Sequence, residues 1–438
     1  MKSMILVLLA GGAVLGAAEL LTLADAVRRA VASHPNVESA KAMLKASAER
    51  IPEAKAGYLP RVDYQESWVR SNNPVFVFGS LLTQRQFGLQ NFAIDSLNRP
   101  DFLNNFQSLV SAEQVLWDAG RTRKAVEIAE TGRKASQVSV RQVELAMASR
   151  AARAYLDAQL TRAAIPVAEQ AVKAAEADLR QAEAVRDVGR STAADALSVR
   201  VHLAGMQEQL LLRRAEAKIA EAVLGELVGA AEDVSFELTT GMSLLVKKIE
   251  TGVAERPEVE QRRLQVDAAR QQGEMARLAY LPQVGLRVGF EADRQRFVTR
   301  AGANWMAGVT FRWTPYSGGA DRARVRMAVE TQRAAEAGEK AMQRQVKVEV
   351  MQAETMLEAS SARVETAESA IAAGEESLRI TRDRYEAGLT NVTELLRTET
   401  AMTEARLRLL VAQHGVRSAQ LNHAAALGKL GPDSEVLQ

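Results

Sequence analysis

The pattern of apolar and polar positions divides the chain into long helical stretches and short alternating ones. Residues from Arg121 to Asp187 and from Asp321 to Ala387 are mostly Ala, Glu, Gln, Arg, Leu and Val, which is the composition of long helices. Each stretch ends near a glycine, Gly189 or Gly388, and a further helical stretch follows at once. Because glycine readily leaves a helix in a left-handed conformation, the pattern predicts two long antiparallel helical hairpins with tight tips.

Before each long helical stretch the apolar period shortens to two residues, which is typical of β-strands with one apolar face. Val284 to Ala292 and Trp305 to Trp313 alternate in this way around a polar loop, and the alternation is regular. The sequence therefore predicts a β-hairpin with strands of about ten residues, a length that can cross a bilayer.

An equivalent hairpin precedes the first long helix, but its pattern is weaker. Alternation begins at Val62 on one strand and at Phe106 on the other, while Glu66 and Gln114 interrupt the apolar face. The register of this first hairpin is therefore less strongly specified by the sequence.

Matching motifs recur at fixed offsets in the numbering, so the chain contains one unit twice. The matched positions are Pro35 with Pro257, Pro60 with Pro282, Gly120 with Gly319 and Gly189 with Gly388. The first two pairs share one offset (257 − 35 = 282 − 60 = 222), and the last two share a smaller one (319 − 120 = 388 − 189 = 199). The first copy therefore carries an insertion equal to the difference of the offsets, 222 − 199 = 23, at roughly 74–101. This aromatic-rich segment either folds back over a rim or presents a contact surface, or is an ordinary exposed loop.

The duplication predicts the domain boundaries. A first repeat covers residues 19–228, with a β-hairpin at 58–117 and a helical tip near 189. A connector covers 229–254, and a second repeat covers 255–438, with a β-hairpin at 280–316 and a tip near 388.

The N-terminus has the pattern of an export signal. Met1-Lys2 is a basic start, Met4 to Leu15 is apolar, and Gly16-Ala17-Ala18 supplies small residues. This pattern predicts a secretory signal peptide over residues 1–18, which is too short to cross a bilayer permanently. A membrane-anchoring helix is the alternative.

Composition and motifs give no indication of catalysis. The 438 residues contain 56 basic and 54 acidic side chains, a balance that offers no electrostatic case for nucleic acid. Cysteine is absent, which excludes disulfides and thiolate chemistry. No phosphate-binding loop or nucleophile elbow is present, and the four histidines lack metal-ligand spacing. We therefore expect no enzyme activity, cofactor or metal site.

All four tryptophans, Trp68, Trp117, Trp305 and Trp313, lie in or beside the predicted strands. Aromatic residues at the ends of outward-apolar strands are typical of the two interfaces of a bilayer; a small soluble core is the alternative. Four strands cannot close a barrel, and open edges are not tolerated in lipid. A membrane barrel would therefore require further copies of the chain.

At this point the chain resembles the TolC family of outer-membrane efflux proteins. The motifs that carry the resemblance are the two Tyr-Leu-Pro strand entries, the turns at Trp117-Asp118-Ala119-Gly120-Arg121 and Tyr316-Ser317-Gly318-Gly319-Ala320, and the tips Asp187-Val188-Gly189-Arg190-Ser191 and Glu386-Ala387-Gly388-Leu389-Thr390. They extend over essentially the whole mature chain, in the same order in both repeats.

The resemblance implies an α+β fold in which a long α-helical barrel continues a transmembrane β-barrel. Each chain would supply four strands, and a homotrimer would complete twelve. The protein would be an outer-membrane exit duct with a periplasmic helical extension, working with a periplasmic adaptor and an inner-membrane pump in efflux or type I secretion. A soluble periplasmic coiled-coil adaptor or scaffold is the alternative, and it leaves the tryptophan-rich strands unexplained.

The resemblance also assigns roles near the tips, where such hairpins converge and close the pore. By position, Tyr385 and Asp195 match partners in the closing contact, and Glu394 matches a pore-lining acid. Simple packing for Tyr385 and a solvated face for Glu394 are the alternatives. Adaptor docking is expected at Gly189, Arg190, Ser191, Gly388, Leu389 and Thr390. Thr390 occupies a position where the family often has an arginine. Arg190, at the tip of the first hairpin, is the residue that could replace that arginine.

Overall fold

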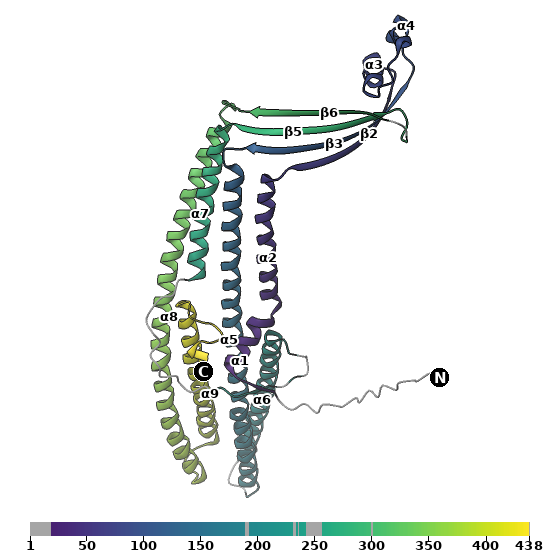
Figure 1. The fold of residues 1–438 in the computed structure, drawn as a ribbon. Helices are drawn as coiled ribbons and strands as arrows, with labels where there is room; N and C mark the ends of the chain where they lie inside the picture. Colours follow the sequence, from purple (N-terminus) through teal and green to yellow (C-terminus); the bar gives the residue numbers. More distant parts are fainter. Residues whose placement is uncertain are drawn as a thin grey trace, which may run out of the picture. The chain divides into compact units, whose positions relative to one another are not determined.

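The computed structural model describes residues 19–188, 192–230, 234, 236–241, 256–298 and 301–437. The predicted signal peptide, residues 1–18, and three of the predicted tip residues, 189–191, lie outside this part of the chain. The described residues form long helices, one four-stranded sheet and one two-stranded sheet, so the fold is α+β as predicted (Figure 1).

The helices are α1 (Leu23–Ser33), α2 (Pro35–Lys55), α3 (Pro74–Thr83), α4 (Ile94–Asn98), α5 (Arg121–Asp187), α6 (Ala193–Val228), α7 (Pro257–Arg277), α8 (Ala320–Glu386) and α9 (Val392–Ala426). The strands are β1 (Glu19–Leu21), β2 (Arg61–Ser71), β3 (Leu103–Trp117), β4 (Phe236–Leu238), β5 (Gln283–Arg294) and β6 (Gly302–Arg312). Within the described chain, none of these helices is both long and apolar enough to cross a membrane.

The two repeats build the same elements at the offsets seen in the sequence. Both limits of α7 follow those of α2 at the larger offset (257 − 35 = 277 − 55 = 222), and both limits of α8 follow those of α5 at the smaller one (320 − 121 = 386 − 187 = 199). Helices α5 and α8 each have 67 residues. The range predicted for the first long helix is the range of α5, and α8 begins and ends one position before its predicted limits.

Two compact units cut across these repeats, because each repeat contributes to both. One unit combines the N-terminal segment to Ala42 with Val138–Glu260 and the chain from Lys340 onward. The other combines Met43–Gln137 with Gln261–Glu339. The second unit contains the four-stranded sheet, and the first contains the outer parts of the long helical hairpins.

The four-stranded sheet is antiparallel in the order β2-β3-β5-β6, so the hairpins of the two repeats join through β3 and β5. Trp68 pairs with Phe106 and Trp305 with Phe290, near one end of the strands. Trp117 and Trp313 lie at the other end. The strands run 11 to 15 residues, somewhat longer than predicted.

The polar interruptions of the first hairpin have partners on the same face. Glu66 forms an ion pair with Arg294, at 2.7 Å, and accepts hydrogen bonds from Tyr64 and Ser108. The Gln114 amide donates to the backbone carbonyl of Tyr58, at 3.0 Å. Both residues keep the register that the weak alternation indicated, because the fold supplies a partner for each polar group.

The core of the first unit centres on Tyr155 of α5, which is fully buried. Its hydroxyl donates to the carbonyl oxygen of Leu21, at 3.1 Å, and accepts from the amide of Thr240, at 3.0 Å. Strand β1, which contains Leu21, pairs in parallel with β4. One hydroxyl therefore connects both chain segments of the small sheet to a long helix.

Replacing Tyr155 with phenylalanine removes both hydrogen bonds, so the Thr240 amide loses this acceptor, while the Leu21 carbonyl still accepts from the Thr239 amide. We expect a loss of about 1–3 kcal/mol in the free energy of unfolding. Circular dichroism at 222 nm during heating would measure the change in stability. Tyr316→Phe, at a site that is 82% exposed, is the matched control, and an equal effect of the two substitutions would contradict the assignment.

Candidate gate between the two helical hairpins

The turn between α8 and α9 is a compact left-handed helix end. Gly388 has φ = 73°, a conformation that favours glycine. The Gly388 amide donates to the carbonyl of Tyr385, and the Leu389 amide donates to that of Arg384, which is the Schellman arrangement. Leu389 is 69% exposed, and the Asn391 side chain then caps α9. The predicted tip residues 388–390 thus form a rigid exposed turn.

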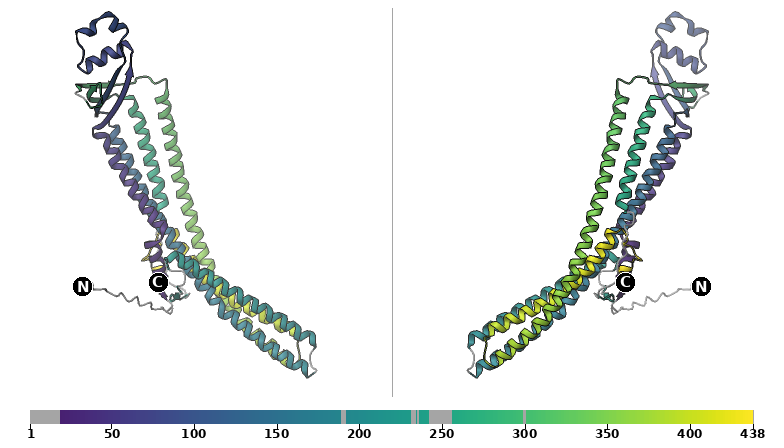
Figure 2. Two further views of the ribbon diagram at one scale, coloured as in Figure 1. Left: turned by 90° about the vertical axis from the view of Figure 1, so that its right-hand side faces the viewer. Right: turned by 90° about the vertical axis from the view of Figure 1, so that its left-hand side faces the viewer.

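Near the tips, the two hairpins pack through a small apolar cluster. Its members come from α5, α6, α8 and α9: Ala182, Ala196, Val199 and Val392 are buried, and Leu179, Tyr385 and Leu396 pack against them. Figure 1 shows that the α5–α6 and α8–α9 tips lie at the same end of their unit. Figure 2 shows α5 beside α6 and α8 beside α9.

Tyr385 and Asp195, the predicted closing partners, belong to this region. Burial, together with the negative charges of Asp195 and Asp178, raises the pKa of the Tyr385 hydroxyl. The Asp195 carboxylate also caps α6, accepting from the Thr192 hydroxyl at 2.9 Å and from its amide at 3.1 Å. The structure therefore brings these residues into electrostatic contact and gives each a packing or capping role as well.

Glu394, the predicted pore-lining acid, lies in the first turn of α9. Its backbone amide donates to the Asn391 side chain, at 3.0 Å, and its carboxylate lies 4.0 Å from Arg397 with about half of the side chain exposed. A carboxylate near a helix N-terminus is stabilised by the helix dipole. This position suits either a solvated face or a pore lining, and the pore role remains a prediction.

A polar cluster that the sequence did not indicate lies on the side of the apolar cluster away from the tips. It takes one side chain from each of the four helices: Asp178 from α5, His202 from α6, Arg382 from α8 and Glu399 from α9. Arg382 binds Glu399 at 2.5 Å, and the carboxyl groups of Asp178 and Glu399 lie within hydrogen-bonding reach. Both acids are buried, Asp178 with 6% of its surface exposed and Glu399 with 7%.

The surroundings of Asp178 in this cluster raise its pKa to about 7. Burial is the largest cause, and the hydrogen bond and negative charge of Glu399 add to it, while Arg382 and His202 oppose it. Burial also lowers the pKa of His202. Below about pH 7 the Asp178 carboxyl therefore tends to keep its proton, and a protonated Asp178 can donate a hydrogen bond to Glu399 on the second hairpin.

A signal for this cluster exists in the duplication. Glu183 and Arg200 form an ion pair between α5 and α6, at 2.8 Å. Adding the repeat offset gives 183 + 199 = 382 and 200 + 199 = 399, which are the positions of Arg382 and Glu399. Both hairpins thus carry an ion pair at equivalent positions with the charges reversed. A comparison of charges between the repeats would have found the pair, although not its contact with Asp178.

Comparisons with known proteins agree with this architecture. The model of the outer membrane efflux protein family matches residues 26–230 and 249–429. The outer membrane efflux protein BepC of Brucella suis is 24% identical, in an alignment covering 99% of this chain and 91% of that protein.

Solved structures share the fold at low identity. The CmeC outer membrane channel of Campylobacter jejuni has a TM-score of 0.79 at 15% identity, covering 94% of this chain and 87% of that one. The outer membrane protein VceC of Vibrio cholerae has a TM-score of 0.76 at 19% identity, covering 94% and 97%.

The family match extends over both repeats and most of the chain, and it confirms the resemblance seen in the sequence. The localisation predicted from that resemblance, the outer membrane, is confirmed with it. This chain belongs to the outer membrane efflux protein family.

Proposed function

We propose that the chain forms a homotrimeric exit duct, which passively conducts substrates delivered by an inner-membrane pump across the periplasm and the outer membrane. The observation that carries the proposal is the four-stranded sheet, in which β2 and β6 are edge strands within the described chain. Lipid does not tolerate unpaired strand edges, so neighbouring copies must pair with them. Three copies give 3 × 4 = 12 strands, which suffices for a membrane barrel.

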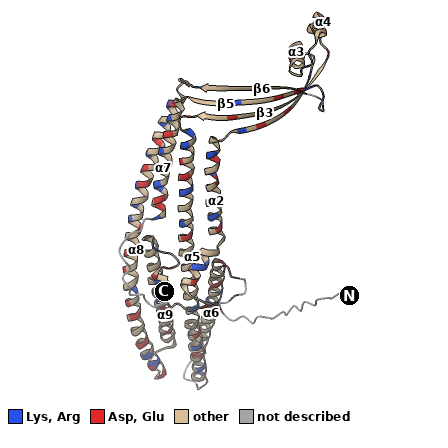
Figure 3. Ribbon diagram, in the orientation of Figure 1, with Lys and Arg blue, Asp and Glu red and all other residues tan. Residues whose placement is uncertain are grey.

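The side chains of the sheet support this placement. The tryptophans lie at two levels, one at each end of the strands, and all four are about half exposed or more in the single chain. Charged residues are frequent along the helices (Figure 3), whereas strands β3 and β6 carry one each, Glu113 and Arg312. A barrel with two aromatic girdles and an outward apolar band has this distribution, whereas a soluble scaffold protein would bury its tryptophans.

The hairpin tips are the expected docking surface for a periplasmic adaptor. Leu389 projects from the rigid turn between Gly388 and Thr390, and apolar side chains exposed on such turns serve as anchors in interfaces. The equivalent residues Gly189, Arg190 and Ser191 would complete the surface. In this proposal the inner-membrane pump supplies the energy, because the chain has no nucleotide-binding motif.

Conductance in planar bilayers tests the duct directly. The detergent-purified protein is expected to give small, cation-selective steps, because a ring of three Glu394 carboxylates would concentrate cations at the entrance. Glu394→Ala should reduce that selectivity severalfold. Glu404→Ala, an exposed acid on the same helix paired with Arg408, is the control and should retain it. A protein that forms no channels and fractionates without detergent would contradict the duct and favour a scaffold.

A further inference from the structure

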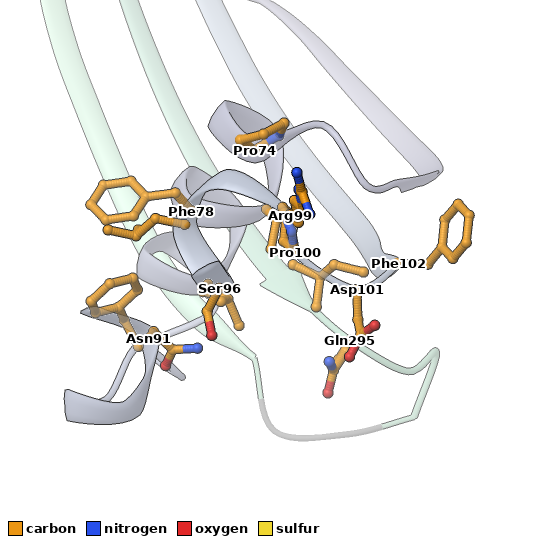
Figure 4. Close-up of a pocket in the computed structure, with 14 residues that line it drawn as sticks. Pro74, Phe78, Asn91, Ser96, Arg99, Pro100, Asp101, Phe102 and Gln295 are labelled. Carbon is orange, nitrogen blue, oxygen red and sulfur yellow. The ribbon is translucent and has the colours of Figure 1, made fainter. Parts of the chain in front are cut away.

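The inserted segment of the first repeat forms a small packed body at one end of the four-stranded sheet. Figure 1 shows its helices α3 and α4 at the strand ends farther from α2 and α7. The Phe87 ring packs edge-on against the rings of Phe78 and Phe92, with centroids 4.9 and 5.1 Å apart. Phe78 also lines a cavity of about 270 Å³, with Gln295 from the chain after β5 on its far side (Figure 4). The segment therefore has an interior of its own.

The two faces of the sheet differ in chemistry. Side chains of directly paired residues lie on the same face of an antiparallel sheet, and successive residues along a strand alternate between the faces. Trp68 pairs with Phe106, and Phe106 pairs with Arg294, which is four positions from Phe290 on β5. Phe290 in turn pairs with Trp305. These residues therefore share one face, the tryptophan face, and the positions between them form the opposite, polar face, which includes Asn105, Gln107, Glu291, Asp293 and Asn304.

The inserted segment packs on the polar face. The Gln84 amide donates to the side-chain oxygen of Asn105 on β3, at 2.8 Å, and the Asn105 amide donates to the Asp293 carboxylate on β5, at 2.7 Å. A Cβ atom added at Gly302, the direct partner of Asp293, would lie 1.9 Å from the carbonyl oxygen of Thr83. Gln84 is 3% exposed and Asp293 0%. The segment thus covers the polar face at this end of the strands and leaves the tryptophan face on the other side.

Helix α3 keeps an apolar side exposed. Val77, Ser80 and Gln84 recur at helical spacing and form its buried side, which contacts the strands through Gln84. Val75 and Leu82 lie two positions before Val77 and Gln84, which places them about 200° around the helix. They are 81% and 49% exposed. The apolar side of α3 therefore points away from the strands, and apolar side chains gathered in this way on a surface indicate a contact.

We propose that the inserted segments of three copies pack against one another through this side of α3 and form an apolar cap across the outer end of the β-barrel. The inference rests on the trimeric duct proposed above. In that duct the tryptophan face meets lipid, so the polar face lines the lumen. A helix side that points away from the polar face then points toward the barrel axis. Eight strands are filled by their own side chains, whereas a larger barrel needs additional chain to close its lumen.

The position and charge of the segment favour further copies of itself as the occupant. The segment begins at Pro74, shortly after β2 ends at Ser71. Because β2 is an edge strand within the described chain, each inserted segment begins beside the boundary with a neighbouring copy. Residues 74–101 contain two basic and two acidic side chains, Arg85, Arg99, Asp95 and Asp101, so three copies can meet without net repulsion.

The apolar side of α3 also has room for a neighbouring helix. Gly79 lies between Val75 and Leu82 at helical spacing, and a Cβ atom added there would meet nothing within 4 Å. Glycine at such a place allows another backbone to approach closely. Helix α3 has no charged residue, so the contact buries no unpaired charge.

Cross-linking tests the contact in the assembled protein. The chain contains no cysteine, so Leu82→Cys supplies a single thiol per copy. A bis-maleimide with a short linker is expected to join two copies of this variant in outer-membrane vesicles. Val309→Cys, at an equally apolar and exposed site on the tryptophan face of β6, is the control. It should not cross-link within a trimer, because lipid-facing positions of the three copies lie on different sides of the barrel.

Labelling from outside the cell tests the closure. Ser111 lies on the polar face of β3, six positions from Asn105, or about 20 Å deeper along the strand. A maleimide carrying a polymer chain of several kilodaltons, added to intact cells, should react slowly with Ser111→Cys. Adding Val75→Asp and Leu82→Asp should speed the reaction at least about tenfold, because carboxylates are costly to bury in an apolar contact. A small methanethiosulfonate should label both variants.

The control for the two aspartates is Val298→Asp in the loop after β5. Val298 is 88% exposed, and its neighbour Phe297 packs on Phe106 of the tryptophan face, with ring centroids 5.9 Å apart. This substitution should leave the labelling of Ser111→Cys unchanged.

Native mass spectrometry of the same preparations separates the cap from the duct, because it counts the chains without depending on α3. A trimer in which Leu82→Cys does not cross-link, or in which the aspartates do not change polymer labelling, would overturn the cap and leave the duct. A cross-link from Leu82→Cys to a different protein would also overturn the cap. A monomer that fractionates without detergent would overturn the duct and the cap together.

Discussion

Replacing Arg382 with methionine is expected to open the duct. Methionine keeps most of the side-chain volume but leaves Glu399 and Asp178 without the cation that balances them. Removing one partner of a buried ion pair costs about 3–5 kcal/mol. Because the Arg382 side chain is 42% exposed, a cost of about 2 kcal/mol is more realistic, equivalent to about a 30-fold shift toward separated hairpins. Single-channel recording should show a higher open probability or larger steps.

The duplication supplies the matched control for this experiment. Arg200→Met breaks the equivalent ion pair of the first hairpin, in which the Arg200 side chain is 61% exposed. Exposed pairs contribute about 0–1 kcal/mol, so the conductance should hardly change. Equal effects of the two substitutions would show that the four-helix polar cluster has no special role in closure.

Conduction is also expected to depend on pH through Asp178, and Asp178→Asn should remove that dependence. The pKa of Asp178 is about 7 when the hairpins are packed, against 3.8 for a free aspartate. Between these values the packed state binds more protons than the separated state, so the contact weakens as pH rises from about 4 to about 7. The full pKa shift would lower the free energy of separating the hairpins by at most about 4 kcal/mol per chain. Open probability should therefore increase over this interval in the wild type.

The asparagine variant keeps a hydrogen-bonding side chain at this position but cannot titrate, so its open probability should stay nearly constant over the same interval. Glu183→Gln, which removes a partly exposed acid from the equivalent ion pair, is the control and should keep the wild-type profile. A wild-type profile that falls with pH, or an Asp178→Asn profile that still rises, would assign the pH response to other groups.

The elements that the sequence predicted well are those with long, uninterrupted signals. Helix α5 spans 67 residues that are mostly strong helix formers, and β5 alternates from Val284 to Ala292 because one face is apolar. The strand register was harder to assign where Glu66 and Gln114 interrupt the apolar face. The partner of Glu66 is Arg294, which is distant in the sequence, and the partner of Gln114 is the backbone carbonyl of Tyr58.

The candidate sites depend more strongly on tertiary structure. Tyr385 and Asp195 were indicated by a family resemblance and are near one another in the fold. Asp178 and Glu399 lie in different repeats, about half the chain apart, and each resembles an ordinary acid on a charged helix. Only the packing of four helices makes them a pair, and no local pattern encodes that packing.

The reversed charges of the two ion pairs also constrain how the repeats can have diverged. A glutamate–arginine pair that becomes an arginine–glutamate pair by direct single exchanges passes through an intermediate with two like charges, unless both positions change together or a neutral residue intervenes. Beside Asp178, an intermediate with two glutamates would place three acids at one buried point. The effect of a substitution at position 382 therefore depends on the residue at position 399. Recombination between the two halves of the gene would separate Arg382 from Glu399, and either charge alone would be unbalanced.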